Sequence, residues 1–308
     1  MITTITLNPA LDKLLRVGDF IWGDTNRTEC LAQSAAGKGV DVAKILRDLD
    51  YEVCATGFLG GVNLPLFEKF FESERITDEF VKIKGSTRTN IQLFSADGKR
   101  TELLEKGPEI SAEESEALLK KVDELKQNSS VIAICGSAPS GISNEYFSRL
   151  IRTSKDSNAI VVTDTSGELL KVAIKEKSAL IKPNKLEMLE LMGKKKAELS
   201  EIIEFAQQIV KASVPYVLIS MGGEGALLVC EKGVWRGKAP DVEVKSTLGC
   251  GDTMVASCCI SFLDKHSPEA MLKNAIALSS ANAMTFETAH VTKNDFESLL
   301  KVVNVEKI

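Results

Sequence analysis

Residues 247–254 (Thr-Leu-Gly-Cys-Gly-Asp-Thr-Met) combine two glycines with a carboxylate in front of an apolar run. Gly249 and Gly251 carry no Cβ, so the backbone can turn tightly there and approach a ligand closely. The strand-like run Val242–Lys245 precedes the stretch, and the run Val255–Leu263 predicts a helix after it. Because the start of a helix leaves its first amides unpaired, and such amides bind anions, the stretch predicts an anion site.

Asp252 determines which chemistry this anion site supports. A carboxylate repels a phosphate beside it, so Asp252 is explained if it faces a group that must lose a proton, such as a hydroxyl that attacks a phosphate. The alternative is a glycine turn followed by an ordinary Asp in the first turn of a helix, where the negative charge complements the helix dipole. The motif alone is equally compatible with both explanations.

A second glycine-rich helix start lies at Ala35-Ala36-Gly37-Lys38-Gly39. Apolar residues follow it at helical spacing, namely Val40, Ala43, Leu46 and Leu49. A lysine at a glycine-rich helix start again indicates an anion site. A flexible turn with a solvent-facing Lys38 explains the same residues equally well.

The composition argues against several classes of protein. The 308 residues are 44% hydrophobic, which is enough for a sizeable core, and they carry a net charge of −5. The main basic cluster, Lys194-Lys195-Lys196, has no interleaved aromatic residues, so we expect no nucleic-acid partner. No apolar run approaches the ~20 residues needed to cross a bilayer, so we expect a soluble protein with neither a signal peptide nor a membrane contact. The seven cysteines form no Cys-x-x-Cys and no metal-ligand pattern with the two histidines, which indicates reduced thiols in a cytoplasmic protein.

Strands that alternate with helices account for most of the chain. The first strand, Met1–Leu7, has a buried pattern and ends at Asn8-Pro9, where the chain must leave the strand. The later strands are Glu52–Phe58, Val131–Cys135, Ala159–Thr163, Ala179–Ile181 and Tyr216–Ser220, and the helices include Ser143–Thr153, Glu168–Ile174, Lys185–Met192 and three at about 251–264, 268–285 and 293–302. This alternation predicts an α/β fold, a mostly parallel central sheet with helices on both faces.

Two segments do not fit this alternation. Residues at about 11–36 have mixed polarity, and residues at about 85–106 contain a β-hairpin, Asn90–Leu104, with its turn at Asp97-Gly98. We expect the two segments to pair as one small β-sheet, a lid inserted in two pieces into a single domain of residues 1–308. The exposed edges of such a sheet invite pairing with a second chain, so we expect a homodimer through the lid.

Polar residues follow the strand ends, where open parallel sheets bind their ligands. Asp12 follows the first strand, Asp164 follows a later one, and Lys182-Pro183-Asn184-x-x-Glu187 follows the next. Asn184 and Glu187 can face one point, such as a hydrated Mg²⁺, although the same pair is also a helix capping box. The glycine-rich strand exit Ser220–Gly225 suits a nucleotide, with a plain turn as the alternative.

Other chemistries find less support. The chain has no phosphate loop of the Gly-x-x-x-x-Gly-Lys-[Ser/Thr] type, no Gly-x-Gly-x-x-Gly fingerprint and no Gly-x-Ser-x-Gly nucleophile elbow. We expect His266 and His290 to be surface or capping residues. Arg27 and Arg88 lie one in each lid segment, where each guanidinium either grips a phosphate or is an ordinary surface arginine.

The order and types of these motifs resemble the ribokinase-like (pfkB-type) sugar kinases over nearly the whole chain. The matching motifs are Thr6-Leu7-Asn8-Pro9-Ala10-x-Asp12, Asn26-Arg27, Ala35-Ala36-Gly37-Lys38-Gly39, Gly57-Phe58-Leu59-Gly60, Thr87-Arg88-x-Asn90, Gly136-Ser137-x-Pro139-x-Gly141, Asp164-x-Ser166-Gly167, Lys182-Pro183-Asn184-x-x-Glu187 and Gly249-x-Gly251-Asp252. Within that family the chain resembles the phosphosugar branch, first the 1-phosphofructokinases and next the tagatose-6-phosphate kinases.

The resemblance implies ATP-dependent phosphorylation of a phosphorylated ketohexose. The expected reaction converts fructose 1-phosphate to fructose 1,6-bisphosphate, and the alternative converts tagatose 6-phosphate to tagatose 1,6-bisphosphate. A nucleoside-type kinase and a non-catalytic sugar-phosphate-binding protein are less favoured alternatives. The former needs no lid arginines for a substrate phosphate, and the latter does not need Asp252, Asn184 and Glu187 together.

The resemblance also implies a role for each matching residue. Asp252 would be the general base, and the amides of Gly249, Cys250 and Gly251 would form the anion hole. Mg²⁺ would lie near Asn184 and Glu187, held through water. The residues around ATP would be Lys182, Asn184, Glu187, Ser220, Gly222, Gly225 and Thr247. The residues around the sugar would be Asp12, Gly37, Lys38, Asp41, Asn90, Ser137 and Asp164, with Arg27 and Arg88 holding its existing phosphate from the lid.

Two positions depart from the family's pattern. Asp41 stands where the family usually has Asn, which puts a carboxylate near an anionic substrate and bears on the choice of sugar. Cys250 replaces the usual Ala or Ser. We expect Cys250 to be tolerated because that position acts through its backbone amide.

Overall fold

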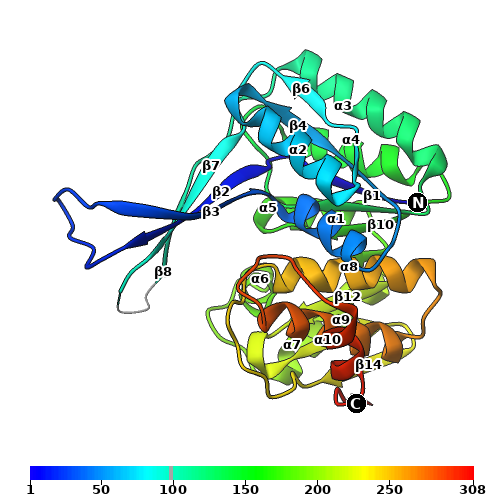
Figure 1. The fold of residues 1–308 in the computed structure, drawn as a ribbon. Helices are drawn as coiled ribbons and strands as arrows, with labels where there is room; N and C mark the ends of the chain where they lie inside the picture. The colour runs from blue at the N-terminus through cyan, green and yellow to red at the C-terminus, as the bar shows by residue number, and fades with distance from the viewer. Residues whose placement is uncertain (97–99) are drawn as a thin grey trace.

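The computed structural model describes residues 1–96 and 100–308, so the predicted turn at Asp97-Gly98 lies outside the described residues. Figure 1 shows a body in which helices pack on a large sheet, and an arm of β-strands that projects from one side of this body. The body carries both chain ends, and the arm is formed by residues from the first third of the chain.

The central sheet is mostly parallel, as predicted. Its parallel strands are β1 (Ile2–Thr6), β4 (Val53–Gly60), β5 (Thr77–Asp78), β6 (Val81–Ile83), β9 (Val131–Cys135), β10 (Ile160–Asp164), β11 (Leu180–Ile181) and β12 (Tyr216–Ser220). Three antiparallel strands extend one edge, namely β13 (Ala226–Cys230), β14 (Gly233–Gly237) and β15 (Val305–Lys307). The order is β15-β14-β13-β12-β11-β10-β9-β1-β4-β5, and β6 pairs separately with β4. Because the parallel strands run the same way, their carboxyl ends meet at one edge of the sheet.

Helices cover both faces of this sheet, because successive residues of a strand point to opposite sides. In β9, Val131 and Ala133 belong to one buried apolar cluster, whereas Ile132 and Ile134 belong to the other. The first cluster is covered by α1 (Lys38–Asp48), α2 (Leu64–Glu74), α8 (Cys250–Leu263), α9 (Pro268–Ala283) and α10 (Lys293–Leu300). The second is covered by α3 (Ala112–Leu125), α4 (Asn144–Lys155), α5 (Gly167–Lys175), α6 (Lys185–Leu191) and α7 (Leu199–Ala212). The predicted layer order, helices on both faces of a parallel sheet, is confirmed.

The prediction of a strand at Val242–Lys245 is wrong. This segment is irregular, and Val244 is 58% exposed. The nearby sheet edge belongs to β14, and β15 from the end of the chain pairs with that edge. The segment therefore has no strand to pair with, and Lys245 instead donates its backbone N–H to the carbonyl of Ala283 in α9.

The helices α3 and α7 were not predicted, although both begin with a recognisable signal. Oγ of Ser111 accepts a hydrogen bond from the amide of Glu114, and the carboxylate of Glu114 accepts one from the amide of Ser111. Glu198 and Glu201 form the corresponding pair at the start of α7. These capping boxes satisfy amides that the first turn of a helix leaves unpaired.

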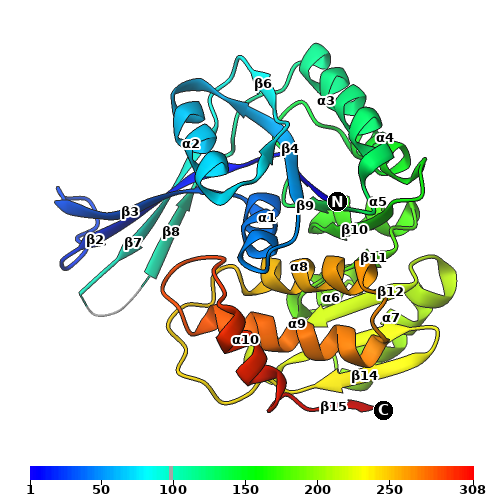
Figure 2. The ribbon, with the colours of Figure 1, turned by 45° about the vertical axis from the view of Figure 1, so that its right-hand side comes forward.

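A separate four-stranded sheet, here called the lid sheet, forms the projecting arm (Figure 2). Its strands are β2 (Ala10–Val17), β3 (Thr28–Ala36), β7 (Arg88–Phe94) and β8 (Arg100–Leu104), in the order β3-β2-β7-β8. The segments at about 11–36 and 85–106 meet in the parallel pair β2 and β7, where Asp12 lies opposite Asn90. The strands β3 and β8 form the two edges, and most of their residues are exposed.

Candidate active site

The turn in front of α8 has the geometry of an anion site. Gly249 caps the helix with φ of 77°, in the left-handed region that favours glycine. A Cβ at this position would lie 2.7 Å from the backbone nitrogen of Ala289, so no other residue fits without a shift. The first bond of the helix joins the amide of Thr253 to the carbonyl of Gly249 at 2.8 Å. The amides before Thr253 therefore lie at the open, electropositive end of α8.

Asp252 lies in the first turn of α8 and is only 9% exposed. Its Oδ1 atom is buried and has no hydrogen-bond partner among the described residues. Burial raises the pKa of Asp252 to about 7, although the positive charges of Lys38 and Lys182 oppose the shift. A buried carboxylate with a free oxygen and a pKa near neutrality can accept a proton from a substrate hydroxyl.

Two lysines and one aspartate form a charged chain beside Asp252. Asp164, at the end of β10, is fully buried, and its Oδ2 lies 3.0 Å from Nζ of Lys38 at the start of α1. Its Oδ1 lies 3.2 Å from Nζ of Lys182, which follows β11. Burial alone would raise the pKa of Asp164, but the two ammonium groups outweigh it and hold this pKa below its ordinary value. Asp164 is therefore ionised and holds both lysines in place.

Lys182 also faces the anion turn. Its Nζ lies 3.3 Å from the point that a Cβ on Gly251 would occupy. The sequence analysis placed Lys182 near the nucleotide phosphates, and the structure places its ammonium group directly against the turn. Lys38 and Lys182 together supply positive charge on two sides of the space where a phosphate could bind.

Three of the expected sugar residues lie on the lid sheet and on α1, namely Asp12, Asn90 and Asp41. Asp12 accepts hydrogen bonds from Asn90 at 2.9 Å and from Gln92 at 3.2 Å, both on β7. Gln92 was missed by the sequence analysis, although it lies two residues after Asn90 and therefore on the same face of the strand. Desolvation raises the pKa of Asp41 well above its ordinary value, and the negative charges of Asp252 and Asp12 add to the effect. Asp41 thus lies within the electrostatic reach of both carboxylates.

Two further expected residues lie where β1 and β9 end. Gly37 caps α1 with φ of 125°, and a Cβ there would lie 3.0 Å from the Cα of Pro9. Ser137 is exposed and accepts a hydrogen bond of 3.3 Å from Nδ2 of Asn8. Asn8 also donates to the carbonyl of Lys106 at 3.2 Å, so it joins Ser137 to the end of the lid sheet. Asn8 belongs to a recognised motif but was not assigned a role from the sequence.

The two arginines of the lid sheet occupy different places. Arg88 lies at the starts of β2 and β7, here called the root of the lid sheet. Its guanidinium donates to the carbonyls of Glu105 at 2.9 Å and Asn8 at 3.1 Å. Its Nε is buried and has no partner within the described part of the chain. Arg27 is exposed at the far end of β3, about 30 Å along the strand from Gly37. Within one chain, the structure does not bring Arg27 together with the other expected residues.

A cavity of about 510 Å³ lies on the other side of the anion turn. This volume is within the range of typical small-molecule sites. Its lining includes the expected residues Ser220, Gly222, Gly225, Thr247, Cys250 and Gly251. The sequence analysis missed the lining from α9, which includes Ile276 and Ser280, because these positions carry no motif.

Asn184 and Glu187 form the helix capping box that was one of the two explanations left open. Asn184 Oδ1 accepts from the amide of Glu187 at 2.9 Å, and Glu187 Oε2 accepts from the amide of Asn184 at 2.8 Å. Ser220 donates its amide to the carbonyl of Pro183 at 3.1 Å, which places the end of β12 beside this capping box. The capping box therefore lies beside Ser220, which lines the cavity.

An open, mostly parallel sheet, an anion turn, a buried carboxylate with a pKa raised to about 7 and an adjoining ligand cavity are together typical of a phosphotransferase. Residues 2–294 match the model of the pfkB family carbohydrate kinases, and the chain belongs to this family. The resemblance stated from the motifs is thereby confirmed. None of the helices in residues 1–96 and 100–308 has the length and apolar character that a bilayer crossing requires.

Several known proteins are similar over the full chain. A tagatose-6-phosphate kinase of Staphylococcus epidermidis (strain ATCC 12228 / FDA PCI 1200) is 31% identical, and a 1-phosphofructokinase of Bacillus subtilis (strain 168) is 32% identical, each with complete coverage of both chains. The crystal structure of the phosphofructokinase-2 from Escherichia coli in complex with fructose-6-phosphate has a TM-score of 0.91 at 25% identity and covers 98% of each chain. The Arabidopsis thaliana ribokinase, at 17% identity and a TM-score of 0.79, covers 97% of this chain and 98% of its own and shows the fold alone. The predicted ribokinase-like fold and kinase activity are confirmed.

Proposed function

We propose that this chain transfers the γ-phosphoryl group of ATP to a hydroxyl of a phosphorylated ketohexose. The preferred substrate is fructose 1-phosphate, which gives fructose 1,6-bisphosphate. The observation that carries the proposal is the buried, unpaired Oδ1 of Asp252, with a pKa raised to about 7, at the open end of α8. A base and an anion site then face two different reactants across one turn.

In the proposed reaction, the sugar hydroxyl oxygen forms a bond to the γ-phosphorus while the bond from this phosphorus to the leaving oxygen of ADP breaks. Asp252 takes the proton that the hydroxyl loses. The amides of Gly249, Cys250 and Gly251, with Lys182, face the negative charge on the transferred group. Phosphoryl transfer depends chiefly on such positioning and charge stabilisation, because the protein has little covalent chemistry to perform.

Mg²⁺ fits this site only through water and substrate phosphates. No group of three or more His, Cys, Asp or Glu residues that could hold a metal occurs in the described ranges. Mg²⁺ commonly keeps several waters and needs one or two carboxylates, and Glu187 has a second oxygen besides the Oε2 used in the capping box. When bound, the ion would neutralise charge on the phosphates, and Glu187 and Asn184 would orient its waters.

The substrate's own phosphate is assigned to the root of the lid sheet. Arg88 has a buried Nε without a partner among the described residues, and a phosphate oxygen would satisfy it. This unsatisfied donor favours a phosphorylated substrate over a free sugar or a nucleoside. Tagatose 6-phosphate remains the second candidate, because the relatives include both kinds of kinase at nearly equal identity.

A homodimer and a cytoplasmic location are parts of the same proposal. The edge strands β3 and β8 are mostly exposed, and large apolar side chains lie on them, including Leu31, Leu103 and Leu104. Exposed strand edges with apolar side chains favour association with another chain. The seven cysteines all lie in described residues and are free thiols, which supports a reducing compartment.

An ADP-release assay tests the proposed substrate class. The purified protein is supplied with ATP and, in turn, fructose 1-phosphate, fructose 6-phosphate, tagatose 6-phosphate and the unphosphorylated sugars. We expect kcat/KM to be highest for fructose 1-phosphate and lower by about 10²-fold or more for the free sugars, because they leave Arg88 unpaired. Equal rates with free and phosphorylated sugars would contradict the assigned substrate class, and a preference for tagatose 6-phosphate would select the second candidate.

The substitution Asp252→Asn tests the catalytic assignment. It keeps the size of the side chain but removes the proton acceptor, so we expect kcat to fall by ~10²–10⁴ while ATP binding stays nearly unchanged. Asp264→Asn is the matched control, because Asp264 caps the other end of the same helix and is exposed. An Asp252→Asn protein with unchanged turnover would refute the role of Asp252.

A further inference from the structure

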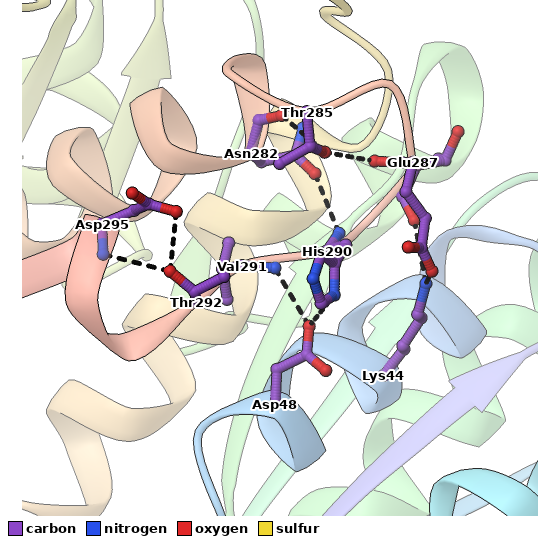
Figure 3. Close-up of polar contacts among 10 residues, drawn as sticks. Lys44, Asp48, Asn282, Thr285, Glu287, His290, Val291, Thr292 and Asp295 are labelled. Carbon is purple, nitrogen blue, oxygen red and sulfur yellow. Dashed lines mark hydrogen bonds and ion pairs between the residues drawn. The ribbon is translucent and has the colours of Figure 1, made fainter.

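Asn282, near the end of α9, is completely buried, and both ends of its carboxamide are used. Its Nδ2 donates to the carbonyl oxygen of Leu248 at 2.6 Å and contacts Sγ of Cys250 at 3.4 Å. Its Oδ1 accepts a hydrogen bond from the backbone N–H of His290 at 3.2 Å. One side chain thus joins the anion turn to the loop of residues 284–292, as Figure 3 shows for the loop side.

The part of the anion turn before the first helical bond depends on such outside contacts, because the hydrogen bonds within residues 246–250 are long. The amide of Cys250 lies 3.4 Å from the carbonyl of Thr247, and the amide of Leu248 lies 3.3 Å from Oγ of Ser246. Both distances exceed those of typical hydrogen bonds. On its carboxyl side Gly249 is held by Thr253, whose amide and Oγ1 donate to the Gly249 carbonyl at 2.8 and 2.7 Å. The Leu248–Gly249 peptide on its amino side is positioned by Asn282 and by the close packing of Gly249 on Ala289.

The bond to Leu248 sets the direction of a catalytic amide. The carbonyl of Leu248 and the N–H of Gly249 belong to one planar peptide unit, and in a trans peptide these two groups point in opposite directions. Within the described residues there is no cis peptide. The Asn282 side chain holds the Leu248 oxygen toward α9, so the Gly249 N–H is directed away from α9.

The loop that Asn282 holds is also fixed to α1. Lys44 donates to Oε1 of Glu287 at 2.5 Å, and Oδ2 of Asp48 lies 3.0 Å from Nδ1 of His290 (Figure 3). The backbone N–H of Val291 donates to the same Asp48 oxygen at 3.0 Å. The other end of α1 carries Lys38, so the loop connects this helix to the anion turn through Asn282.

We propose that Asn282 is a positioning residue that orients the Leu248–Gly249 peptide, so that the Gly249 amide meets the transferred phosphoryl group. Asn282 itself is absent from the lining of the cavity beside the turn, whereas its neighbours Ser280 and Ala283 belong to it. It therefore acts through the turn rather than by touching a substrate. This inference rests on the proposed phosphoryl transfer at the turn, and one of its tests needs no turnover.

The main variant is Asn282→Asp, which keeps the size of the side chain and an acceptor for the His290 amide but removes the donor to Leu248. With ATP and the best sugar phosphate, we expect kcat to fall by about 10- to 100-fold, because one amide of the anion hole is misdirected. KM for the sugar phosphate should stay within about twofold, since the sugar residues lie on other elements. Asn274→Asp, on the same helix, is the matched control and should keep the wild-type kcat.

A pH series separates orientation from a merely structural role. When protonated, the introduced carboxyl can donate its O–H to the Leu248 carbonyl. The ratio of variant to wild-type kcat should therefore rise as the pH is lowered from about 8 to about 6. Because Asp252 titrates in both proteins, its effect on kcat cancels in this ratio. The other titratable groups nearest to Asn282 on the contacting segments are the Cys250 thiol and the His290 ring. The proposal would be overturned if Asn282→Asp had the kcat of the wild type at pH ~8, or if the ratio of the two kcat values did not change with pH.

An NMR experiment decides the same point without turnover. Carbonyl-¹³C leucine with ¹⁵N-glycine selects the two Leu-Gly peptides of the chain, at Leu59-Gly60 and Leu248-Gly249. We expect inorganic phosphate to shift the Gly249 amide in the wild type and to shift it much less in Asn282→Asp. The Gly60 amide already donates to Oγ1 of Thr87 and serves as the internal control. An equal response in both proteins, or none in the wild type, would overturn the role of Asn282, whereas a lack of any kinase activity would contradict only the proposed function.

Discussion

At the scale of single residues, the site depends on how burial and charge set the protonation of four neighbouring ionisable groups, Asp164, Asp252, Lys38 and Lys182. Asp164 stays ionised because two lysines contact it, whereas Asp252 has a pKa raised to about 7 because burial outweighs the same lysines. Each pKa unit corresponds to about 1.4 kcal/mol of preference for one protonation state. Two carboxylates in one site thereby acquire different tasks: Asp164 positions cations, and Asp252 can exchange a proton.

The raised pKa of Asp252 predicts an acidic limb in the activity of the wild-type protein. The base must be ionised to accept a proton, so activity is lost as the pH falls below the pKa of about 7. We expect kcat/KM for the sugar phosphate to drop about tenfold per pH unit on the acid side of this pKa. A pH series of kcat/KM under limiting sugar phosphate measures this value for the free enzyme. A limb near the ordinary aspartate pKa of 3.8 would contradict the environment described for Asp252.

Asp41 predicts a second pH effect, on substrate binding. Desolvation and the charges of Asp252 and Asp12 raise its pKa well above the ordinary value, so on the acid side of that pKa Asp41 is neutral, as an Asn would be. As the pH rises through that pKa, Asp41 gains a negative charge that repels a sugar phosphate. We expect KM for the sugar phosphate to rise as the pH is raised through the pKa of Asp41 in the wild type and to stay flat in Asp41→Asn. An identical pH dependence of KM in the two proteins would show that Asp41 does not face the substrate.

At the scale of elements, the lid sheet presents two arginines at very different distances from the chemistry. β2 and β7 pair in parallel, so residues at their starts, including Asp12 and Arg88, lie at the root of the lid sheet beside α1. β3 returns from the far end of the sheet to Gly37, which leaves Arg27 at that far end. The length of β3 therefore separates Arg27 from the site of its own chain, whereas Arg88 lies close enough to serve it.

The substitution Arg88→Ala tests the role of the lid root. It removes a guanidinium assigned to the substrate's own phosphate, so we expect KM for the sugar phosphate to rise by about 10- to 100-fold and KM for ATP to change by less than about threefold. Arg16→Ala is the control, because Arg16 lies in the same sheet and forms an exposed ion pair with Glu29. Steady-state kinetics with each substrate varied in turn measures both constants. Equal increases for both substrates would remove Arg88 from the phosphate site.

At the scale of the whole molecule, the lid sheet projects from the body, and both of its edges are unpaired among the described residues. Leu31 on β3 is 38% exposed, and Leu103 and Leu104 on β8 are 51% and 61% exposed. Edges of this kind are usually covered or blocked, because their free backbone groups pair with other strands. A second copy of the chain is the simplest cover for this surface.

The dimer prediction is tested by mass in solution. We expect light scattering at micromolar concentration to give twice the chain mass of 33.4 kDa. The double substitution Leu31→Glu with Leu103→Glu places charges on both edge strands, so we expect it to give the monomer mass. Val302→Glu, at a 56% exposed apolar position outside the lid sheet, is the control. A wild-type protein of monomer mass would refute the proposed assembly.

The amino-acid sequence by itself determined the fold class, the motifs and most of the strand ends, for local physical reasons. Strands and helices alternate with recognisable periodicity, and parallel strands must bring their carboxyl ends to one edge of a sheet. Asp12, Asp164, Lys182 and the turn at Gly249 could therefore be expected to gather. The local pattern predicted a strand at Val242–Lys245, and this prediction was wrong. The nearby edge strand β14 pairs with β15, so that edge is not open to this segment.

Tertiary structure alone decided how these residues act on one another. Lys38 and Asp164 are 126 positions apart, and Asn282 and Leu248 are 34 apart, so no spacing rule connects them. The pKa of Asp252 depends on how deeply α8 is buried and on which charges lie beside it, and neither property is local in the sequence. The sequence could name a base and an anion turn, but the charge on that base and the direction of the turn's amides follow from packing between distant elements.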